Sequence, residues 1–419
     1  MNIHILFGIT GDLARKKVIP ALKTLADTVY AQTGTQGLFF IGAGRKPIPP
    51  VEFSSLQQSK YIQGDLQQKK LFQSIKAVIE KDILPKHITK NIEVVTITVY
   101  SSLPPDVHES IVQSTIEHVV GPIKKHVAKR YKAELKTNIV IEKPLGTNLE
   151  SAKHILNVFE KTKNNSMHFY YVDHYLAKDA LIQLEQVSEI CPLLLAPTFG
   201  SADLKEITAH LYETFGVEGR GSFYDPVGAL YDVGQNHLLQ VLARAIRIRI
   251  KVILDQKAQA GQVVDKTKNL PSVAAILASL AIQGKMVFGQ YKGYLDVEHV
   301  KKDSKTETFF HVSFGVTGPL LKKYPELKDI KYTISSGKAV SVQKSGIDLV
   351  YKKQKNHIDF SRGNHDAYFN VFQAVYNQNT SVFADPESIV ASWKVAERIK
   401  KLKTKADLVV YTHTRDIIC

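Results

Sequence analysis

Short apolar runs alternate with stretches of helical periodicity in the first part of the chain, and few folds accommodate this alternation. Four apolar runs predict buried strands: Asn2 to Phe7, Leu38 to Ile41, Ile92 to Val99 and Asn138 to Ile141. Apolar residues recur at helical spacing over Leu13 to Leu25, Lys69 to Ile83 and Val107 to Val119. Because strands that alternate with helices form a parallel, doubly wound sheet, we expect an α/β, Rossmann-like domain over residues 1–172.

The second part of the chain has a different pattern, in which strand-like runs follow one another without helices between them. After Leu204 to Leu211, these runs are Met286 to Tyr294, Thr306 to Val316, Ile330 to Ile334 and Ile347 to Tyr351. Consecutive strands favour antiparallel pairing. A helix-rich stretch from Asp366 to Lys403 follows them. We therefore expect residues 173–419 to form an α+β domain with a large, mainly antiparallel sheet.

Length and composition agree with a soluble protein of two domains. A chain of 419 residues exceeds the size at which one hydrophobic core stops growing. No apolar run is long enough to cross a bilayer, and Asp12 and Arg15 interrupt the apolar start where a secretory signal would continue. The only cysteines are Cys191 and Cys419, so we expect no disulfide framework and no cysteine metal site. These features predict a cytoplasmic protein without a membrane anchor.

The charge balance indicates an anionic partner. Lysine and arginine outnumber aspartate and glutamate by 55 to 40, which gives a net charge of +15. The basic residues are spread along the chain, and no aromatic RNA-binding motif or zinc finger accompanies them. We therefore expect a mostly solvated basic surface with one local phosphate-binding cluster, and no nucleic-acid partner.

A glycine turn joins the first predicted strand to the first predicted helix. Its residues are Gly8, Ile9, Thr10, Gly11, Asp12 and Leu13. A glycine at this position lets the backbone approach a pyrophosphate, and the helix N-terminus favours the negative charge. The turn departs from the G-x-G-x-x-G pattern because Thr10 stands where the second glycine is usual. Taken alone, an ordinary turn and a dinucleotide site explain it equally well.

The residues after the second predicted strand distinguish between NAD and NADP as the bound dinucleotide. No acidic residue follows Leu38 to Gly42 to bind a ribose 2′-hydroxyl, and Arg45 and Lys46 follow instead. A guanidinium binds a 2′-phosphate through two hydrogen bonds. The pair therefore predicts NADP as the cofactor, against the alternative of two basic residues in a surface loop.

Polar residues gather at three further places. Lys143 follows the fourth predicted strand within Glu142-Lys143-Pro144, a sharp extended turn in which a cis peptide bond is one alternative. Asp173 to Lys178 follows the apolar run His168 to Val172, which is a fifth predicted strand. The carboxylate, imidazole, phenol and ammonium of Asp173 to Lys178 suit a phosphate-binding site with an oriented base. Gly228 to Gln240 is helical in period and places polar side chains among leucine and valine. Buried polar groups need partners, so this helix favours a site over a structural histidine.

Several blocks of the sequence resemble those of glucose-6-phosphate dehydrogenase. In chain order they are FGITGDLARKK, LPP at residues 103–105, IEKPLG, VDHYLAKD, EGRGSFYD, DVGQNHLLQVL, VFGQYKGYL, SGKA at residues 336–339, and Asp366-Ala367-Tyr368 with Trp393. EKP also occurs in other sugar and inositol dehydrogenases, whereas DHYLxK followed by QNHLLQ is highly specific. The blocks extend over nearly the whole chain.

This resemblance implies that the protein oxidises glucose 6-phosphate at C1 with NADP, in the oxidative pentose phosphate pathway. His237 would be the general base, oriented by Asp173. The resemblance places the substrate among Lys143, His174, Tyr175, Lys178, Glu213, Asp232 and Lys338. It places NADP among Gly8, Thr10, Gly11, Asp12, Leu13, Arg45 and Lys143. No metal-ligand cluster is recognised in the sequence, so no metal is expected.

The chain also departs from the family pattern. Tyr171 stands where an arginine is usual, Ala177 replaces a glycine, and Ser335 and Gln343 stand where the family has arginines around Lys338. Lys344 is a candidate replacement for these lost cations. The departures leave two alternatives open, which are an NADP oxidoreductase for another sugar phosphate and a catalytically weak sensor of sugar phosphate or nucleotide. The resemblance further implies a homodimer or homotetramer formed through the second domain.

Overall fold

The computed structural model describes residues 1–47, 49–88, 92–403 and 408–412, so Cys419 lies outside the described residues. Packing divides the chain into two compact units. The first contains Met1–Ala177 and His365–Ala384, and the second contains Lys178–Asn364 and the described residues from Asp385 onward. Residues 365–384 thus pack with the N-terminal part of the chain. The division into a cofactor-binding domain over residues 1–172 and a substrate-binding domain over residues 173–419 stays a prediction.

A six-stranded parallel sheet forms the centre of the first unit, with strand order β3-β2-β1-β4-β5-β6. The strands are β1 Asn2–Phe7, β2 Leu38–Gly44, β3 Ser59–Gln63, β4 Val94–Ser101, β5 Glu134–Glu142 and β6 Met167–Val172. The order reverses direction between β1 and β4, the place at which doubly wound sheets bind ligands. The predicted α/β class is therefore confirmed, and β3 is a strand that the apolar pattern missed.

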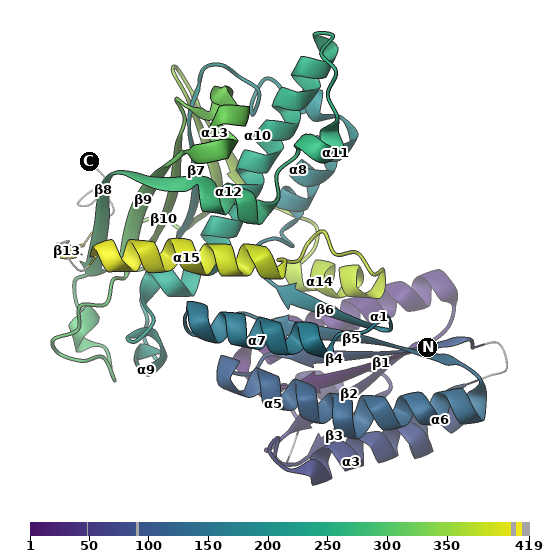
Figure 1. The fold of residues 1–419 in the computed structure, drawn as a ribbon. Helices are drawn as coiled ribbons and strands as arrows, with labels where there is room; N and C mark the ends of the chain where they lie inside the picture. The colour runs from purple at the N-terminus through teal and green to yellow at the C-terminus, as the bar shows by residue number, and fades with distance from the viewer. Residues whose placement is uncertain (48, 89–91, 404–407, 413–419) are drawn as a thin grey trace. The chain divides into compact units, whose positions relative to one another are not determined.

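Helices cover both faces of this sheet, with α5, α6 and α7 in front of it in Figure 1. The helical segments are η1 Ala14–Val18, α1 Ile19–Thr33, α2 Val51–Ser54, α3 Lys69–Val78, η2 Ile79–Ile83, α4 Leu84–His87, α5 Pro105–Thr115, η3 Ile116–Val120, α6 Gly121–Tyr131, α7 Leu149–Thr162 and α14 Ala367–Tyr376. The segments η1, η2 and η3 are π-helices that run into neighbouring α-helices. Ile5, Ile41, Val99 and Ile139 from four neighbouring strands are at most 1% exposed, as expected of strands covered on both faces.

A seven-stranded sheet forms the centre of the second unit, with strand order β12-β11-β7-β10-β9-β8-β13. The strands are β7 Leu204–Tyr212, β8 Leu280–Tyr291, β9 Phe309–Val316, β10 Lys331–Gly337, β11 Lys344–Tyr351, β12 Lys355–Asp359 and β13 Leu408–Tyr411. Four of the neighbouring pairs are antiparallel, and β7 with β10 and β8 with β13 are parallel. The predicted α+β class with a mainly antiparallel sheet is confirmed. The sequence pattern missed β12 and β13.

The two faces of this second sheet differ in polarity. Ile207, Ala209 and Ile334 are fully buried on one face, where α10 packs against β7 and β10. Side chains of the opposite alternation are polar, among them Thr208, His210, Thr333, Ser335 and Asp348. The helical segments of this unit are α8 Asp179–Ile190, η4 Pro192–Leu195, α9 Gly221–Tyr224, η5 Leu230–Leu238, α10 Leu239–Gln259, α11 Lys266–Asn269, α12 Val273–Ser279, η6 Tyr294–Asp296, α13 Gly318–Lys323, η7 Pro325–Leu327 and α15 Pro386–Lys403.

Among the residues that the structure describes, we find no helix with the length and apolar character needed to cross a membrane.

Candidate active site

The glycine turn lies where β1 ends, at the reversal point of the parallel sheet. Gly8 adopts a positive φ of 81°, and the Gly11 N–H donates to the Gly8 carbonyl at 3.0 Å. A Cβ atom at Gly8 would lie 2.7 Å from Ser102 Oγ, which follows β4. Any residue other than glycine would therefore strain the backbone here and require Ser102 to shift. Thr10, Gly11, Asp12 and Leu13 lead from it into the helix that η1 and α1 form together. Such a cradle fits a dinucleotide pyrophosphate.

The structure places Arg45 directly after β2, beside the same edge of the sheet. Gly44, the last residue of β2, has Thr10 Cγ2 3.6 Å from the position that its Cβ would occupy. The Arg45 side chain is exposed, and the Arg45 carbonyl accepts a hydrogen bond from Gln63 Nε2 at 3.2 Å. A fixed backbone with a solvent-exposed guanidinium suits contact with an anionic group of a ligand.

Lys143 directly follows β5, and the peptide bond from Lys143 to Pro144 is cis. A cis bond here was one of the alternatives that the sequence left open. Glu142 before it is 3% exposed and accepts a hydrogen bond from the Tyr100 hydroxyl at 3.0 Å. Burial raises the pKa of Glu142 to about 7, against the opposing effects of Tyr100, Lys143 and Tyr368. Asp173 also acts on this carboxyl and raises its pKa further. The ends of β5 and β6 therefore bring Glu142, Lys143 and Asp173 into one electrostatic cluster.

The residues after β6 are held by the backbone and by aromatic contacts. Asp173 is 5% exposed, and its Oδ1 accepts the Tyr175 N–H at 3.1 Å. The His174 ring stacks on Tyr368, with ring centroids 5.6 Å apart and an angle of 21° between planes. Tyr368 lies on α14, far along the chain, so the sequence alone gave no sign of this contact. Lys178 begins the second unit as the N-cap of α8.

Three predicted substrate residues meet within the second unit. Lys338 Nζ lies 2.5 Å from Glu213 Oε2 and 3.9 Å from Asp232 Oδ2. The Lys338 side chain is 5% exposed, and its ammonium lies over the ring of Tyr224 at 5.4 Å. The Glu213 N–H donates to the Gly337 carbonyl at 2.8 Å, which fixes the two strand ends together. One ammonium between two carboxylates is a set of donors and acceptors suited to sugar hydroxyls.

His237 lies on η5, which is a π-helix where the sequence predicted an α-helical period. The side chain of Asn236 donates from Nδ2 to the Tyr231 carbonyl at 3.0 Å, and His237 is 2% exposed. In a π-helix, hydrogen bonds join residues five apart in the chain. Asp232 and His237 are five apart, so they lie closer to the same face of the helix than they would in an α-helix. Such helices occur frequently at functional sites. Asp173 belongs to the first unit and His237 to the second.

The family departures have structural partners of their own. Ser335 is fully buried, donates to the Phe310 carbonyl at 3.1 Å and accepts from the Tyr212 hydroxyl at 2.8 Å. Gln343 accepts the Thr214 N–H at 3.1 Å through its side-chain oxygen. Lys344, the candidate replacement cation, binds both oxygens of Asp348 at 3.0 Å. Its ammonium is thus already held by a carboxylate on the polar face of the sheet.

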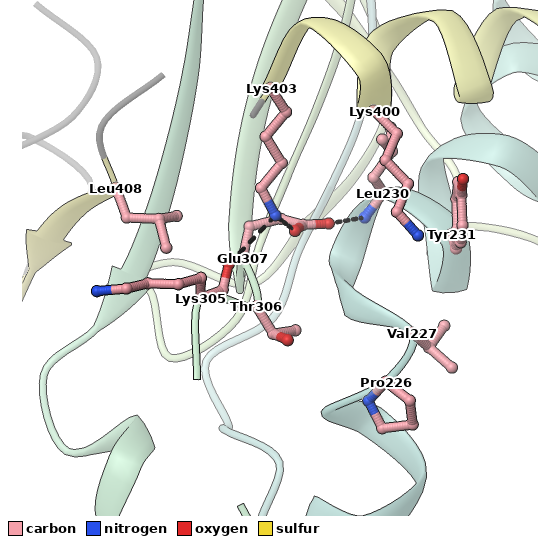
Figure 2. Close-up of a pocket in the computed structure, with 10 residues that line it drawn as sticks. All are labelled: Pro226, Val227, Leu230, Tyr231, Lys305, Thr306, Glu307, Lys400, Lys403 and Leu408. Atoms are coloured by element: carbon pink, nitrogen blue, oxygen red, sulfur yellow. Dashed lines mark hydrogen bonds and ion pairs between the residues drawn. The ribbon is translucent and has the colours of Figure 1, made fainter. Parts of the chain in front are cut away.

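A separate cavity of about 700 Å³ lies beside η5 and the end of α15, and Figure 2 shows the side chains around it. Lys403 forms an ion pair with Glu307, and burial lowers the pKa of Lys403 to about 8. Lys400 Nζ lies 4.4 Å from the centre of the Tyr231 ring. The residues around this cavity include none of the predicted site residues. Sequence reasoning missed the cavity because it took the lysine-rich end of α15 as solvated surface.

Comparison with known proteins identifies related sequences along most of the chain. A family model described as the NAD binding domain of glucose-6-phosphate dehydrogenase matches residues 5–183. A second model, described as the C-terminal domain of the same enzyme, matches residues 191–363. Together the two models match far more than half of the chain.

Individual relatives are distant but similar over long segments. Glucose-6-phosphate 1-dehydrogenase 6, cytoplasmic, of Arabidopsis thaliana is 28% identical over 374 residues, which are 83% of this chain and 66% of the relative. Glucose-6-phosphate 1-dehydrogenase of Helicobacter pylori is 26% identical over 422 residues, covering 93% of this chain and 90% of the relative. The match to the plant protein thus covers slightly less than two thirds of that protein's length.

Two solved structures share the fold. Glucose-6-phosphate dehydrogenase in complex with its substrate glucose-6-phosphate aligns with a TM-score of 0.74 and 18% identity, over 98% of this chain and 94% of the other. Glucose-6-phosphate 1-dehydrogenase from Mycobacterium avium aligns with a TM-score of 0.67 and 20% identity over the same shares. Because the sequence identity is 20% or less, these two structures show only that the fold is shared. With both family models matched in order along one chain, the protein belongs to the glucose-6-phosphate dehydrogenase family.

Proposed function

We propose that this chain oxidises glucose 6-phosphate at C1 to 6-phosphogluconolactone and transfers the hydride to NADP, as in the oxidative pentose phosphate pathway. The observation that carries the proposal is the cluster of Glu213, Asp232 and Lys338, with Lys338 Nζ 2.5 Å and 3.9 Å from the two carboxylates. These residues come from three separate segments. The resemblance implies that Glu213 and Asp232 bind the sugar hydroxyls and that Lys338 closes the pocket.

The cofactor site is assigned to the turn from Gly8 to Leu13, with Arg45 beside it. The lack of room for a Cβ at Gly8 supports close approach of a pyrophosphate to the backbone. Arg45 is assigned to the 2′-phosphate because β2 ends in glycine and no acidic residue follows it. The nicotinamide ring of the cofactor supplies the hydride acceptor. Lys143 is assigned to contact both cofactor and sugar.

His237 is assigned as the general base that removes the proton from the C1 hydroxyl. A neutral imidazole suits this task near pH 7, since it accepts a proton and releases it again at little cost. Asp173 is assigned to orient the imidazole and to stabilise its protonated form. Burial of both side chains, at 2% and 5% exposure, supports roles in which water is excluded.

The remaining residues bind the substrate. His174, Tyr175 and Lys178 are assigned to the phosphate, because an imidazole, a phenol and an ammonium together offer donors to its oxygens. The stacking of His174 on Tyr368 supports a fixed orientation of that ring. Lys143, Glu213 and Asp232 are assigned to the sugar hydroxyls, and Lys338 is assigned to close the pocket. The ion pairs among these residues hold the acceptors in place before the sugar binds.

One observation favours a second candidate, an NADP oxidoreductase for another sugar phosphate. Ser335 and Gln343 replace family arginines, and the structure ties Ser335 to Tyr212 and Gln343 to Thr214. Neither position offers a cation near Lys338. A substrate whose anionic group lies elsewhere would be less affected by these losses.

We further propose that the protein works in the cytoplasm as a homodimer or homotetramer, with its second sheet at the interface. Light scattering coupled to size-exclusion chromatography measures the mass in solution. A mass of two or four chains at micromolar concentration agrees with the proposal, and a single chain at every concentration contradicts it.

A spectrophotometric assay tests the proposed activity. Purified protein is mixed with NADP and glucose 6-phosphate, and NADPH formation is followed by absorbance. The same assay is run with NAD, with free glucose and with other hexose phosphates. We expect turnover with glucose 6-phosphate and NADP and little with free glucose, because the phosphate ligands then have nothing to bind. Arg45→Ala should reduce the preference for NADP over NAD.

Other outcomes separate the alternatives. Faster turnover with a different hexose phosphate would change the assigned substrate and leave the proposed hydride transfer to NADP in place. No turnover with any sugar phosphate, together with measurable binding, would favour the sensor. Turnover with NAD alone would refute the assignment of Arg45.

A further inference from the structure

Three ligand-competent side chains converge on the polar face of the second sheet, at its β12 edge. His210 lies on β7, Asp348 on β11 and His357 on β12, which are neighbouring strands. Asp348 pairs with His357 in the register, and His210 pairs with Gly346. One ligand atom from each side chain lies within 4.8 Å of the other two. The sequence gave no sign of this cluster because His210 lies far along the chain from Asp348 and His357, and only the pairing of β7 with β11 brings them together.

The Asp348 carboxylate lies between the two imidazoles. His357 Nδ1 is 2.8 Å from Asp348 Oδ1, and His210 Nδ1 is 3.6 Å from Asp348 Oδ2. The two rings are nearly parallel, with centroids 5.3 Å apart and an angle of 23° between planes. A Cβ at Gly346 would lie 3.0 Å from His357 Cε1, so glycine leaves room for that ring. The sheet geometry therefore brings two imidazoles and a carboxylate together, with one possible ligand atom of each within 4.8 Å of the others.

His210 supplies an independent sign of a ligand. Its side chain is 1% exposed, and neither ring nitrogen has a hydrogen-bond partner. Buried polar groups are nearly always hydrogen-bonded, so this imidazole needs an explanation. Burial lowers the pKa of His210 to about 4, and a neutral imidazole is the form that binds metal ions. Burial acts to raise the pKa of Asp348, but the neighbouring ammonium groups of Lys355 and Lys344 help to lower it overall.

We propose that His210, Asp348 and His357 bind a divalent transition-metal ion, with Zn²⁺ as the best match. Two imidazole nitrogens and one carboxylate oxygen are a donor set that Zn²⁺ accepts in tetrahedral geometry, with water as the fourth ligand. Mg²⁺ prefers oxygen ligands in octahedral geometry and does not fit this set. The bound ion would connect β7 and β11 to the edge strand β12.

Two lysines compete for the same carboxylate. Lys344 Nζ lies 3.0 Å from Asp348 Oδ1, and Lys355 Nζ lies 2.8 Å from Asp348 Oδ2. Their side chains are 31% and 54% exposed in the single chain, so in one chain both ammonium groups have room to move away from the carboxylate. Metal binding must displace them or tolerate their repulsion. Removing the more exposed lysine should therefore strengthen metal binding, an effect that a purely structural ion-pair network does not predict.

Titration calorimetry of the full chain, after treatment with EDTA, tests the site with ZnCl₂ as the probe. We expect one Zn²⁺ per wild-type chain, binding at least about tenfold weaker in His357→Ala and several-fold tighter in Lys355→Gln. His299→Ala, which changes an exposed histidine of the same unit outside the cluster, should bind like wild type. The His357 side chain is 29% exposed, so its loss should leave the fold intact, which circular dichroism checks.

Two further probes sharpen the result. Co²⁺ should give the strong visible absorption of a tetrahedral site in wild type and lose it in His357→Ala, and Mg²⁺ should leave the Zn²⁺ isotherm unchanged. The proposal is overturned if wild type takes up no stoichiometric Zn²⁺, if His357→Ala binds as tightly as wild type, or if Lys355→Gln weakens binding.

Discussion

His237 is the residue on which the proposed chemistry depends most. It is 2% exposed on η5, the same segment that carries Asp232. His237→Asn removes the proton acceptor and keeps a side chain of similar polarity. We expect kcat to fall by about 10²- to 10⁴-fold with little change in KM, since general-base catalysis contributes on that scale.

Steady-state kinetics with NADP and glucose 6-phosphate measure this effect. His299→Asn serves as the matched control, because His299 is an exposed histidine of the same unit. Turnover of His237→Asn close to that of wild type would show that another group removes the proton.

Glu142 makes stability depend on pH. Burial raises its pKa in the folded protein from 4.5 to about 7. Between these values the unfolded chain releases the proton first, so rising pH favours unfolding. The contribution of Glu142 to stability is complete below about pH 4.5 and is lost as the pH rises through about 7, by about 3 kcal/mol.

Glu142→Gln removes this titration and tests its sign. Urea unfolding at about pH 4 and pH 8 gives the difference in unfolding free energy between variant and wild type. We expect the unfolding free energy of the variant, relative to that of wild type, to be about 3 kcal/mol higher at pH 8 than at pH 4. Glu160→Gln, on the exposed face of α7, should show no such change. An equal difference at both pH values would mean that Glu142 titrates alike in the folded and unfolded chain.

At the scale of single residues, the sequence indicated which residues belong to the candidate site, but it did not show which side chains contact them. It singled out Lys143 and Asp173, and the structure places both within the electrostatic reach of Glu142. It did not single out Glu142 or Tyr368 as members of that cluster. Tyr368 reaches it from α14, whose return to the first unit no local pattern announces.

At the scale of elements, the turn after β1 gives a test of the cofactor site. Gly8→Ala places a side chain at a φ of 81° and 2.7 Å from Ser102 Oγ. We expect a loss of about 1–2 kcal/mol from the backbone conformation, a further loss from the close contact, and weaker binding of NADP. Thermal unfolding and fluorescence titration with NADP measure the two effects.

Gly34→Ala is the matched control for this substitution. Gly34 has a φ of 65°, and a Cβ there meets nothing within 4 Å. It should therefore show the backbone cost alone, with normal NADP binding. If Gly8→Ala binds NADP as tightly as Gly34→Ala does, the pyrophosphate does not lie on this turn.

The alternation of apolar runs predicted five of the six strands of the first sheet, with shifted ends, and missed β3. β3 has the sequence SKYIQ at the edge of the sheet and is only partly buried, so its side chains carry no continuous apolar signal. The edge strands β12 and β13 are similarly short. The π-helical form of η5 also escaped the sequence pattern, because periodicity alone predicts an α-helix there.

At the scale of the whole molecule, the succession of helices and strands predicted both fold classes. The pattern switches from alternation to consecutive strands, and the two sheets follow that switch. It did not predict that residues 365–384 pack with the first unit, since that depends on contacts such as Tyr100 with Phe372 rather than on local sequence. Pairing of residues distant in the chain is therefore what sequence reasoning lacked, both here and at the His210 cluster.

The central claim is that hydride leaves C1 of glucose 6-phosphate for NADP on this protein. Glucose 6-phosphate carrying deuterium at C1 tests it directly, with mass spectrometry of the reduced cofactor as the measurement. We predict one deuterium in each reduced cofactor formed and a slower rate than with the unlabelled sugar if hydride transfer limits turnover. Reduced cofactor without deuterium, or no reduced cofactor at all, would contradict the account.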